Sequence, residues 1–335
     1  VAPNRMVKAS HASDHEPHTG RRVPRALSGR CAAIIAAVRY HLTTFGCQMN
    51  EHDSERMRGL LEGLGWDRAE VRDDADLILF NTCTIRGSAD ERFMGNLGEA
   101  RRIKRERADV IVGVGGCWAQ SQKQRVFEDF PFVVVAFGPG EIARLGEMIA
   151  RERLDAVGAF SLDGAFSADL PTRRGRAHQA WVQISTGCNC VCAYCIVPSV
   201  RGRERSRRPA DVVAEVEGLA TDGVREVTLL GQNVNSFGRD LPREERIGFA
   251  DLLRGVAGVE GVERVRYTSP HPKDMRADVI AAMAECPEVC EHLHLPAQSG
   301  STRVLKAMRR TYSRERYLEL VDRLREAIPD LSLTT

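Results

Sequence analysis

Residues 188–195 in the middle of the chain read CNCVCAYC. They follow an apolar, β-branched run at residues 181–186 and then Gly187, a pattern typical of a loop at the end of a strand. Read as C-x3-C-x2-C, the loop offers three thiolates, from Cys188, Cys192 and Cys195, and a loop this short can wrap around one cubane iron–sulfur cluster. Because such a cluster normally takes four cysteine ligands, one iron would stay open to a further ligand.

Two other interpretations of the loop remain. The thiols could form a zinc knuckle or be buried structural groups, although a C-x2-C zinc site usually pairs with a second such pair or with two histidines, and none follows. Cys190 also offers a competing C-x-C-x-C set, which the spacing disfavours. On the iron–sulfur interpretation, the open iron can chelate the amino and carboxylate groups of S-adenosylmethionine, and an electron passed to the sulfonium releases a 5′-deoxyadenosyl radical.

Three more cysteines each follow a predicted strand directly. The strands are expected at residues 40–46, 77–82 and 110–116, with helices at 50–64 and from Ser88, where Ser88 and Glu91 match a capping box. The cysteines are Cys47, Cys83 and Cys117, separated by 36 and 34 residues, about the length of one βαβ unit. Because the carboxyl ends of parallel strands share one edge of a sheet, we expect the three thiols to lie within reach of one metal site. Taken singly, each could instead be a buried core cysteine.

The alternation of strand and helix patterns predicts an α/β protein with two domains. Residues 1–38 are expected to be a disordered tail, 39–154 a parallel-sheet domain, completed by a strand at 132–137 and a helix at 140–153, and 155–179 a linker. A second βα series at 180–335 has expected strands at 181–186, 224–230, 262–269, 292–295 and 331–335, and a helix that starts at Pro209. The chain ends inside the fifth strand, so we expect a (β/α) barrel that is truncated at its C-terminal end.

Composition excludes several classes of protein. Of the 335 residues, 43% are hydrophobic and 28% are charged, and no apolar run approaches the ~20 residues of a membrane helix. The net charge of +2 neither requires nor excludes a nucleic-acid partner. Ten cysteines without a convincing export signal favour metal or redox chemistry over disulfides.

Together these motifs resemble the radical S-adenosylmethionine methylthiotransferase family over residues 40–335. The loop with Asn189 and Tyr194 resembles the radical S-adenosylmethionine signature, and six cysteines stand in the family order. The segments around the first three, residues 46–50, 81–84 and 115–117, resemble the N-terminal domain of these enzymes. Residues 231–238, GQNVNSFG, and 268–272, TSPHP, are most similar to the branch that modifies N6-isopentenyladenosine next to the tRNA anticodon.

The resemblance implies a methylthiotransferase domain followed by a radical S-adenosylmethionine core, and two [4Fe-4S] clusters with S-adenosylmethionine as cofactors. It implies that Cys47, Cys83 and Cys117 hold the second cluster. The expected reaction adds a methylthio group to C2 of N6-isopentenyladenosine in a tRNA anticodon loop. The alternatives are another modified adenosine, a ribosomal protein, or an inactive truncated iron–sulfur protein. The resemblance further implies a cytoplasmic monomer that acts without a membrane and receives electrons from a flavodoxin or ferredoxin. Because family members continue into a C-terminal tRNA-binding barrel domain, we expect the chain as given to lack that domain.

Residues near the ends of the later strands are candidates for cofactor binding, although each could simply cap a strand. These candidates are Gly231, Gln232, Asn233, Ser269, His271 and Gln298. A dense basic run follows the cysteine loop and could contact tRNA phosphates or be a solvated charged loop. Its members are Arg201, Arg203, Arg205, Arg207 and Arg208.

Overall fold

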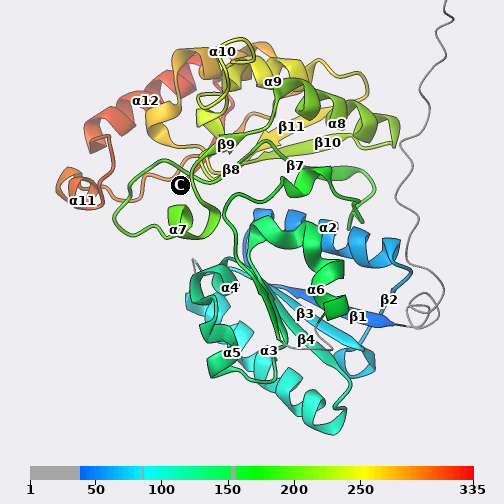
Figure 1. Cartoon of the computed structure of the whole chain (residues 1–335). Coiled ribbons are helices and arrows are strands. Elements are labelled where there is room, and N and C mark those ends of the chain that lie inside the picture. Colours follow the sequence, from blue (N-terminus) through cyan, green and yellow to red (C-terminus); the bar gives the residue numbers. More distant parts are fainter. Residues whose placement is uncertain (1–37, 85–86, 152–155) are drawn as a thin grey trace, which may run out of the picture.

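The computed structural model describes residues 38–84, 87–151 and 156–335 and shows two α/β domains, one above the other in Figure 1. The predicted tail lies outside the described residues except for Val38, as does Cys31. The side chain of Ser88, and with it the predicted capping box, is also outside them. Among the described residues, no helix is both long enough and apolar enough to cross a membrane.

The N-terminal domain is built on a parallel six-stranded sheet with the order β2-β1-β3-β4-β5-β6. Its central strand β3 has the sequence LILFNT, and all six residues are buried, as expected for a strand covered on both faces. The strands are β1 (Arg39–Thr44), β2 (Asp67–Arg68), β3 (Leu77–Thr82), β4 (Ile111–Gly116), β5 (Val135–Phe137) and β6 (Val157–Ala159).

Alternate residues of β3 face opposite cores. Ile78 and Phe80 pack with Phe93 of α3, whereas Leu77 and Leu79 pack with apolar residues of α2 and α6. Helices therefore cover both faces of the sheet (Figure 1). They are α2 (Gln48–Gly63), α3 (Gly87–Glu106), α4 (Cys117–Gln122), α5 (Arg125–Asp129) and α6 (Leu145–Arg151), with 3-10 turns η1 (Arg72–Asp74) and η2 (Pro139–Arg144).

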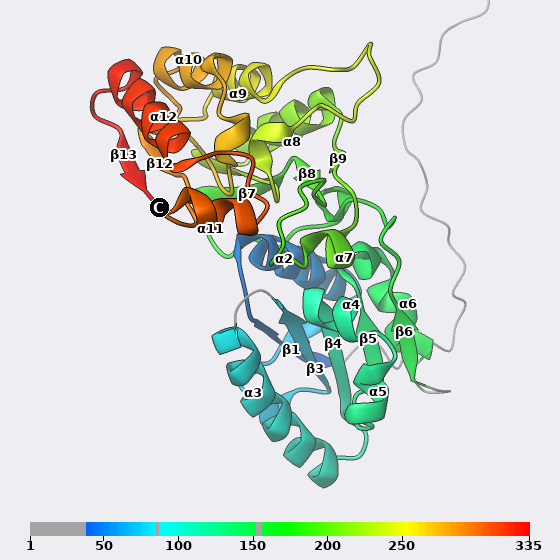
Figure 2. The ribbon, with the colours of Figure 1, turned by 90° about the vertical axis from the view of Figure 1, so that its left-hand side faces the viewer.

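Helix α2 lies between the sheet and the second domain (Figure 2) and contacts both. Its apolar residues Met57 and Leu61 are fully buried in the first domain. Its polar residues Asp53 and Arg56 are also buried, because the second domain covers that side of the helix. The helix is thus an interior element rather than a surface one.

The segment predicted as a linker, residues 155–179, contains structure that the sequence did not predict. Strand β6 within it pairs in parallel with β5 and extends the N-terminal sheet, and a 3-10 turn, η3 (Ser167–Asp169), follows. Gly158 lies in the middle of β6, and the strand is only three residues long, so neither periodicity nor β-propensity marks it.

The second domain contains five parallel strands in two groups. Strands β7 (Gln179–Gln183), β10 (Glu226–Leu230) and β11 (Arg264–Tyr267) form one sheet, and β12 (His292–His294) pairs with β13 (Ser332–Thr334). A single bridge between Val265 and Val289 joins the groups into one open arc. The predicted partial barrel is therefore confirmed.

One predicted strand is divided. Instead of a single strand at 181–186, β7 ends at Gln183, and β8 (Ser185–Thr186) turns away to pair in antiparallel fashion with β9 (Arg205–Ser206). This turn leads the chain into the cysteine loop. The remaining elements are the helices α7 (Val197–Arg201), α8 (Pro209–Thr221), α9 (Phe249–Ala257), α10 (Ala277–Glu285), α11 (Thr302–Ala307) and α12 (Arg314–Ala327), and the 3-10 turns η4 (Val234–Ser236) and η5 (Pro272–Asp274).

Candidate metal centres and the cleft between them

The first cysteine set lies at the carboxyl edge of the N-terminal sheet, as the strand spacing predicts. Cys83 follows β3 directly, Cys117 begins α4 directly after β4, and Cys47 precedes α2. The glycines before two of them are required. A Cβ on Gly46 would lie 2.6 Å from Cβ of Cys83, and Gly116, with φ of +97°, would place its Cβ 2.4 Å from a backbone oxygen of β3. The segments that carry Cys47, Cys83 and Cys117 can therefore approach one another only because Gly46 and Gly116 have no side chains.

Two asparagines, which were not among the predicted site residues, hold this edge in place. The side-chain Nδ2 of Asn81 donates to the backbone oxygen of Asn50 at 2.8 Å and to Oγ of Ser54 at 2.9 Å. In return, Nδ2 of Asn50 donates to the backbone oxygen of Thr82 at 3.1 Å. Both asparagines are fully buried, so these bonds fix the segment of Cys47 against that of Cys83.

The charge environment differs among the three thiols. A hydrogen bond from Cys83 lowers the pKa of Cys47 to about 5, against the opposing effect of burial, and Arg201 and backbone N–H groups at the start of α2 add to the decrease. Burial raises the pKa of Cys117, although Arg201 partly offsets that increase. The site thus favours a negatively charged sulfur at Cys47, the form that binds metals.

The second cysteine set is the loop between β8 and α7. The backbone N–H of Cys188 donates to the backbone oxygen of Gly202 at 3.1 Å, and that of Ala193 donates to the backbone oxygen of Met308 at 3.1 Å. The residues that follow α7 and α11 therefore hold the loop. Cys188 is buried, and Cys190, Cys192 and Cys195 are half-buried. A hydrogen bond from Cys188 lowers the pKa of Cys190 to about 6 and raises that of Cys188. The competing set that includes Cys190 thus stays open.

The donor chemistry of both sets fits an iron–sulfur cluster. Among the residues that the structure describes, no three His, Cys, Asp or Glu side chains converge on one point that could hold a single metal ion. Each set supplies three thiols, the soft donors typical of iron–sulfur clusters, in which each cysteine binds its own iron.

A cleft of about 970 Å³ opens between the domains. Cys47 lines it from the N-terminal domain, and Arg310, whose Nη1 lies 3.3 Å from Sγ of Cys192, lines it from the second domain. Through Arg310 the cleft adjoins the cysteine loop, whose Cys190 and Cys192 line a neighbouring pocket of about 350 Å³ that shares His271 with the cleft. Four of the six predicted cofactor residues also line it: Gln232, Ser269, His271 and Gln298.

Three of these four residues are unusual in ways that suit ligand binding. Ser269 and Gln298 have φ of +62° and +66°, a strained conformation for residues other than glycine that clusters at functional sites. Both side-chain amide atoms of Gln232 are buried, and neither has a hydrogen-bond partner within the described structure. An unpaired buried amide is costly, so a ligand in the cleft would stabilise it.

His271 is held in its neutral form. Burial lowers its pKa to about 3, and the positive charges of Arg310 and Lys273 add to the decrease. The backbone N–H of Lys273 donates to Nδ1 of the ring at 3.1 Å. With Nδ1 accepting, the remaining proton lies on Nε2, so His271 can act as a hydrogen-bond donor in the cleft.

The other two predicted cofactor residues do not line the cleft. Gly231 lies behind its wall, where an added Cβ would be 2.5 Å from Oγ of Ser185. Asn233 is buried and donates Nδ2 to Asp274 at 2.8 Å, and the same nitrogen lies 3.8 Å from Sγ of Cys190. Both therefore stand behind the ligand-facing residues in the structure.

The basic run after the loop does not form the exposed patch that a phosphate-binding role requires. Arg201 and Arg207 are buried in ion pairs with Asp53 and Glu215, and Arg205 is half-buried and bonds backbone oxygens. The run is interior because α7 packs on α4 of the N-terminal domain, whereas Arg207 pairs with α8 of its own domain. Its exposed members are Arg203 and Arg208.

Comparison with known proteins agrees with this architecture. Residues 39–138 match the model of the uncharacterized protein family UPF0004, and residues 182–335 match that of the radical SAM superfamily. The chain is 50% identical over 299 residues to the tRNA-2-methylthio-N(6)-dimethylallyladenosine synthase of Acidothermus cellulolyticus, covering 88% of this chain and 60% of that protein. It is 48% identical over 312 residues to the protein of the same name from Streptomyces griseus, covering 91% and 61%.

Solved structures share the fold at low identity. The radical S-adenosylmethionine methyltransferase TsrM from Kitasatospora setae superposes with a TM-score of 0.55 at 18% identity, covering 88% of this chain and 66% of that one. The cobalamin-dependent S-adenosylmethionine radical enzyme OxsB superposes with a TM-score of 0.56 at 13% identity, covering 89% and 49%. The chain spans about 60% of the length of the curated relatives it matches.

Proposed function

The chain belongs to the radical S-adenosylmethionine methylthiotransferase family, and from this premise we propose that it adds a methylthio group to C2 of N6-isopentenyladenosine beside the anticodon of tRNA. The curated relatives named above, at about half identity, support this choice of substrate. The C–H bond at C2 is unactivated, so acid–base chemistry alone would not replace it and a radical is needed.

One observation carries the proposal: a single cleft is lined by Cys47 from one domain and by Gln232, Ser269, His271 and Gln298 from the other. The reaction needs a radical source and a sulfur source beside the same carbon atom. Two adjoining spaces support that requirement: Cys47 lines the cleft, Cys190 and Cys192 line the neighbouring pocket, and His271 lines both.

The family implies a [4Fe-4S] cluster and S-adenosylmethionine, which we assign to the loop thiols of Cys188, Cys192 and Cys195. We assign a second [4Fe-4S] cluster to Cys47, Cys83 and Cys117. When bound, the loop cluster supplies the electron that cleaves S-adenosylmethionine, and the second cluster carries the sulfur.

The side chains of the cleft would bind and orient the reactants. The unpaired amide of Gln232 offers both a donor and an acceptor to S-adenosylmethionine, and neutral His271 offers an N–H without adding charge. The half-buried walls of the cleft would limit contact of the radical with water.

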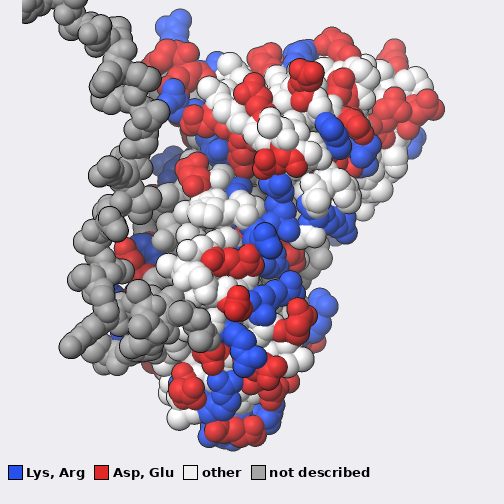
Figure 3. Space-filling view, turned by 90° about the vertical axis from the view of Figure 1, so that its right-hand side faces the viewer, with Lys and Arg blue, Asp and Glu red and all other residues white. Residues whose placement is uncertain are grey.

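We propose tRNA as the partner, bound through its anticodon loop, because unpaired loop bases are the ones a protein can draw into a cleft. Arg58, Arg176 and Arg266 line the cleft and can contact phosphate. On the part of the face in Figure 3 that the described residues cover, blue and red side chains are interspersed, so attraction there is local rather than a broad basic field. A flavodoxin or ferredoxin as electron donor, a monomeric state and a cytoplasmic location complete the proposal.

The test is mass spectrometry of tRNA nucleosides from a strain that lacks this gene, with and without the gene restored. We expect 2-methylthio-N6-isopentenyladenosine to disappear and N6-isopentenyladenosine to accumulate, and we expect the restored gene to reverse both changes. Loss of a different methylthiolated adenosine, or of a methylthiolated ribosomal protein, would overturn the substrate assignment. An unchanged nucleoside profile would overturn the activity.

A further inference from the structure

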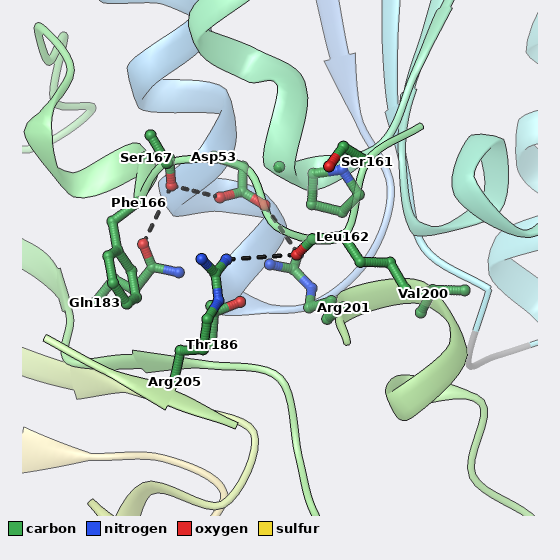
Figure 4. A pocket seen from close by; sticks show the side chains of 13 residues that line it. Asp53, Ser161, Leu162, Phe166, Ser167, Gln183, Thr186, Val200, Arg201 and Arg205 are labelled. Carbon is green, nitrogen blue, oxygen red and sulfur yellow. Dashed lines mark hydrogen bonds and ion pairs between the residues drawn. The ribbon is translucent and has the colours of Figure 1, made fainter. Parts of the chain in front are cut away.

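A buried ion pair joins the two domains beside the first cysteine set. Nη2 of Arg201, at the end of α7, lies 2.8 Å from Oδ2 of Asp53 on α2, and the two side chains are 5% and 2% exposed. Oγ of Ser167 lies 3.1 Å from the other carboxylate oxygen and 3.3 Å from Oε1 of Gln183. Figure 4 shows these residues converging on one small interdomain pocket from separate segments of the chain.

Arg201 also contacts a thiol of the other domain. Its Nε lies 3.4 Å from Sγ of Cys117 in N–H donor geometry, and the Cys117 side chain is almost fully buried. One planar guanidinium thus bonds a carboxylate through Nη2 and a sulfur through Nε, and its rigid plane fixes the direction of both bonds as a flexible lysine ammonium would not.

Helix α7 links this contact to the second cysteine set. Cys195 closes the loop just before α7, and Arg201 is the last residue of the helix, a separation of about 9 Å at the helical rise. Helix α7 packs on α4, which begins at Cys117, and the two lie side by side in Figures 1 and 2. A short rigid element therefore runs from one set of thiols to the other.

The charges explain why Arg201 can be buried there. Burial opposes the charged form, but the ion pair with Asp53 at 2.8 Å offsets the cost of burying the guanidinium. Burial likewise opposes ionisation of Asp53, yet Arg201 and His52 hold its pKa below the usual value. A single buried carboxylate thus balances a single buried guanidinium at this interface.

We propose that Arg201 is a positioning residue for the second cluster: it fixes the Cys117 ligand and, by hydrogen-bonding its sulfur, raises the reduction potential of that cluster. The inference rests on the proposed cluster at Cys47, Cys83 and Cys117. Hydrogen bonds to cluster sulfurs and nearby positive charge favour the reduced, more negative state. Because Arg201 belongs to the second domain, the reduction potential of the N-terminal cluster depends on how the two domains pack together.

The experiment uses the full chain with Cys188, Cys192 and Cys195 all replaced by Ala, so that only the N-terminal set can hold a cluster. Iron and sulfide are counted after anaerobic reconstitution, and the midpoint potential is followed by spectroscopic redox titration. In this background Arg201→Lys keeps the positive charge but removes the planar guanidinium that bonds Asp53 and Cys117 together. We expect one [4Fe-4S] cluster per chain in both proteins and a midpoint potential shifted to more negative values in Arg201→Lys.

A second variant guards against misfolding. Asp53→Asn/Arg201→Met removes both charges, so neither is left buried and unpaired, and it should shift the potential in the same direction. Arg56→Lys is the matched control, because Arg56 makes a buried interdomain ion pair with Glu215 at 2.8 Å and bonds no cysteine. We expect the potential of the Arg56→Lys protein to stay at that of the parent.

The outcomes separate the inference from the proposed function. No cluster in the triple-Ala parent would overturn the second cluster itself. A cluster whose potential is unchanged in both Arg201 variants, or equally shifted in Arg56→Lys, would overturn the role of Arg201 while leaving the second cluster in place.

Discussion

Nη1 of Arg310 lies 3.3 Å from Sγ of Cys192, and the same guanidinium lines the cleft between the domains. Nε of Arg310 also lies 3.2 Å from the hydroxyl of Tyr312, and the charge stands over the Tyr312 ring. The side chain is thereby held in one orientation. One residue thus connects the cysteine loop to the wall of the cleft.

This contact predicts that Arg310 supports the chemistry of the loop. Replacing it with Met removes the N–H···S bond and the positive charge, and loss of such partners of metal ligands typically costs about 10- to 100-fold in metal affinity or activity. We expect Arg310→Met to slow release of 5′-deoxyadenosine from S-adenosylmethionine by that factor, measured by chromatography after chemical reduction. Arg303→Met, at an exposed position of α11, is the control, and equal rates in the two variants would refute the prediction.

The close approach of Cys47 and Cys83 predicts that Gly46 tolerates no side chain. A Cβ there would lie 2.6 Å from both Cβ of Cys83 and Oδ1 of Asn50, at a φ of +143°. We expect Gly46→Ala to lower the free energy of unfolding by about 1–3 kcal/mol or more, because strain and collision add. The measurement is chemical denaturation of the metal-free chain.

Gly98 on α3 provides the matched control for this prediction. An added Cβ there meets no atom within 4 Å, so Gly98→Ala should stabilise the chain by about 0.5–1 kcal/mol through helix propensity. If both substitutions changed stability alike, the proposed crowding at Gly46 would be wrong.

The buried neutral His271 predicts a pH-dependent loss of stability. The pKa of His271 is about 3 in the folded chain and 6.5 in the unfolded chain. Between pH 3 and pH 6.5 the imidazole is therefore protonated in the unfolded state but neutral in the folded state. Stability contributed by this group is present above pH 6.5 and falls as the pH drops towards 3. The loss is at most about 2 kcal/mol at pH 5.

The measurement compares denaturation of the parent with that of His271→Gln at pH 7 and pH 5. Because carboxylate effects are common to both proteins, the difference between them isolates the histidine. We expect the variant to lose less stability than the parent on acidification. Parallel losses would show that the imidazole protonates as readily in the folded chain as in the unfolded chain.

The sequence predicts the parts of this protein that depend on local pattern. The first four residues of β3 form an apolar run, and the predicted and observed limits of the strand agree. The positions of the cysteines after β3 and β4 follow from parallel-strand geometry. The partial barrel is likewise predictable from the sequence, whereas the choice of Cys188, Cys192 and Cys195 as cluster ligands stays a prediction.

What the sequence did not predict depends on contacts between distant segments. Asp53 and Arg56 occupy the polar side of an amphipathic helix and would normally face water, but the second domain covers them. From the sequence, Arg201 and Arg207 belong to a basic run that is expected to be solvated or to bind phosphate. Their burial is explained only by ion pairs with Asp53 and Glu215, which lie on other helices. The partner of Arg201 lies 148 residues away in the other domain, so no periodic signal in the sequence marks the pair.

The central claim is that two cysteine sets each hold a [4Fe-4S] cluster beside one cleft. The most direct measurement is the iron and sulfide content of the anaerobically reconstituted chain and of its Cys192→Ala and Cys83→Ala variants. We predict two clusters in the parent and one in each variant, with 5′-deoxyadenosine release lost only in Cys192→Ala. Zinc in place of iron, or an iron content that neither substitution lowers, would contradict the account.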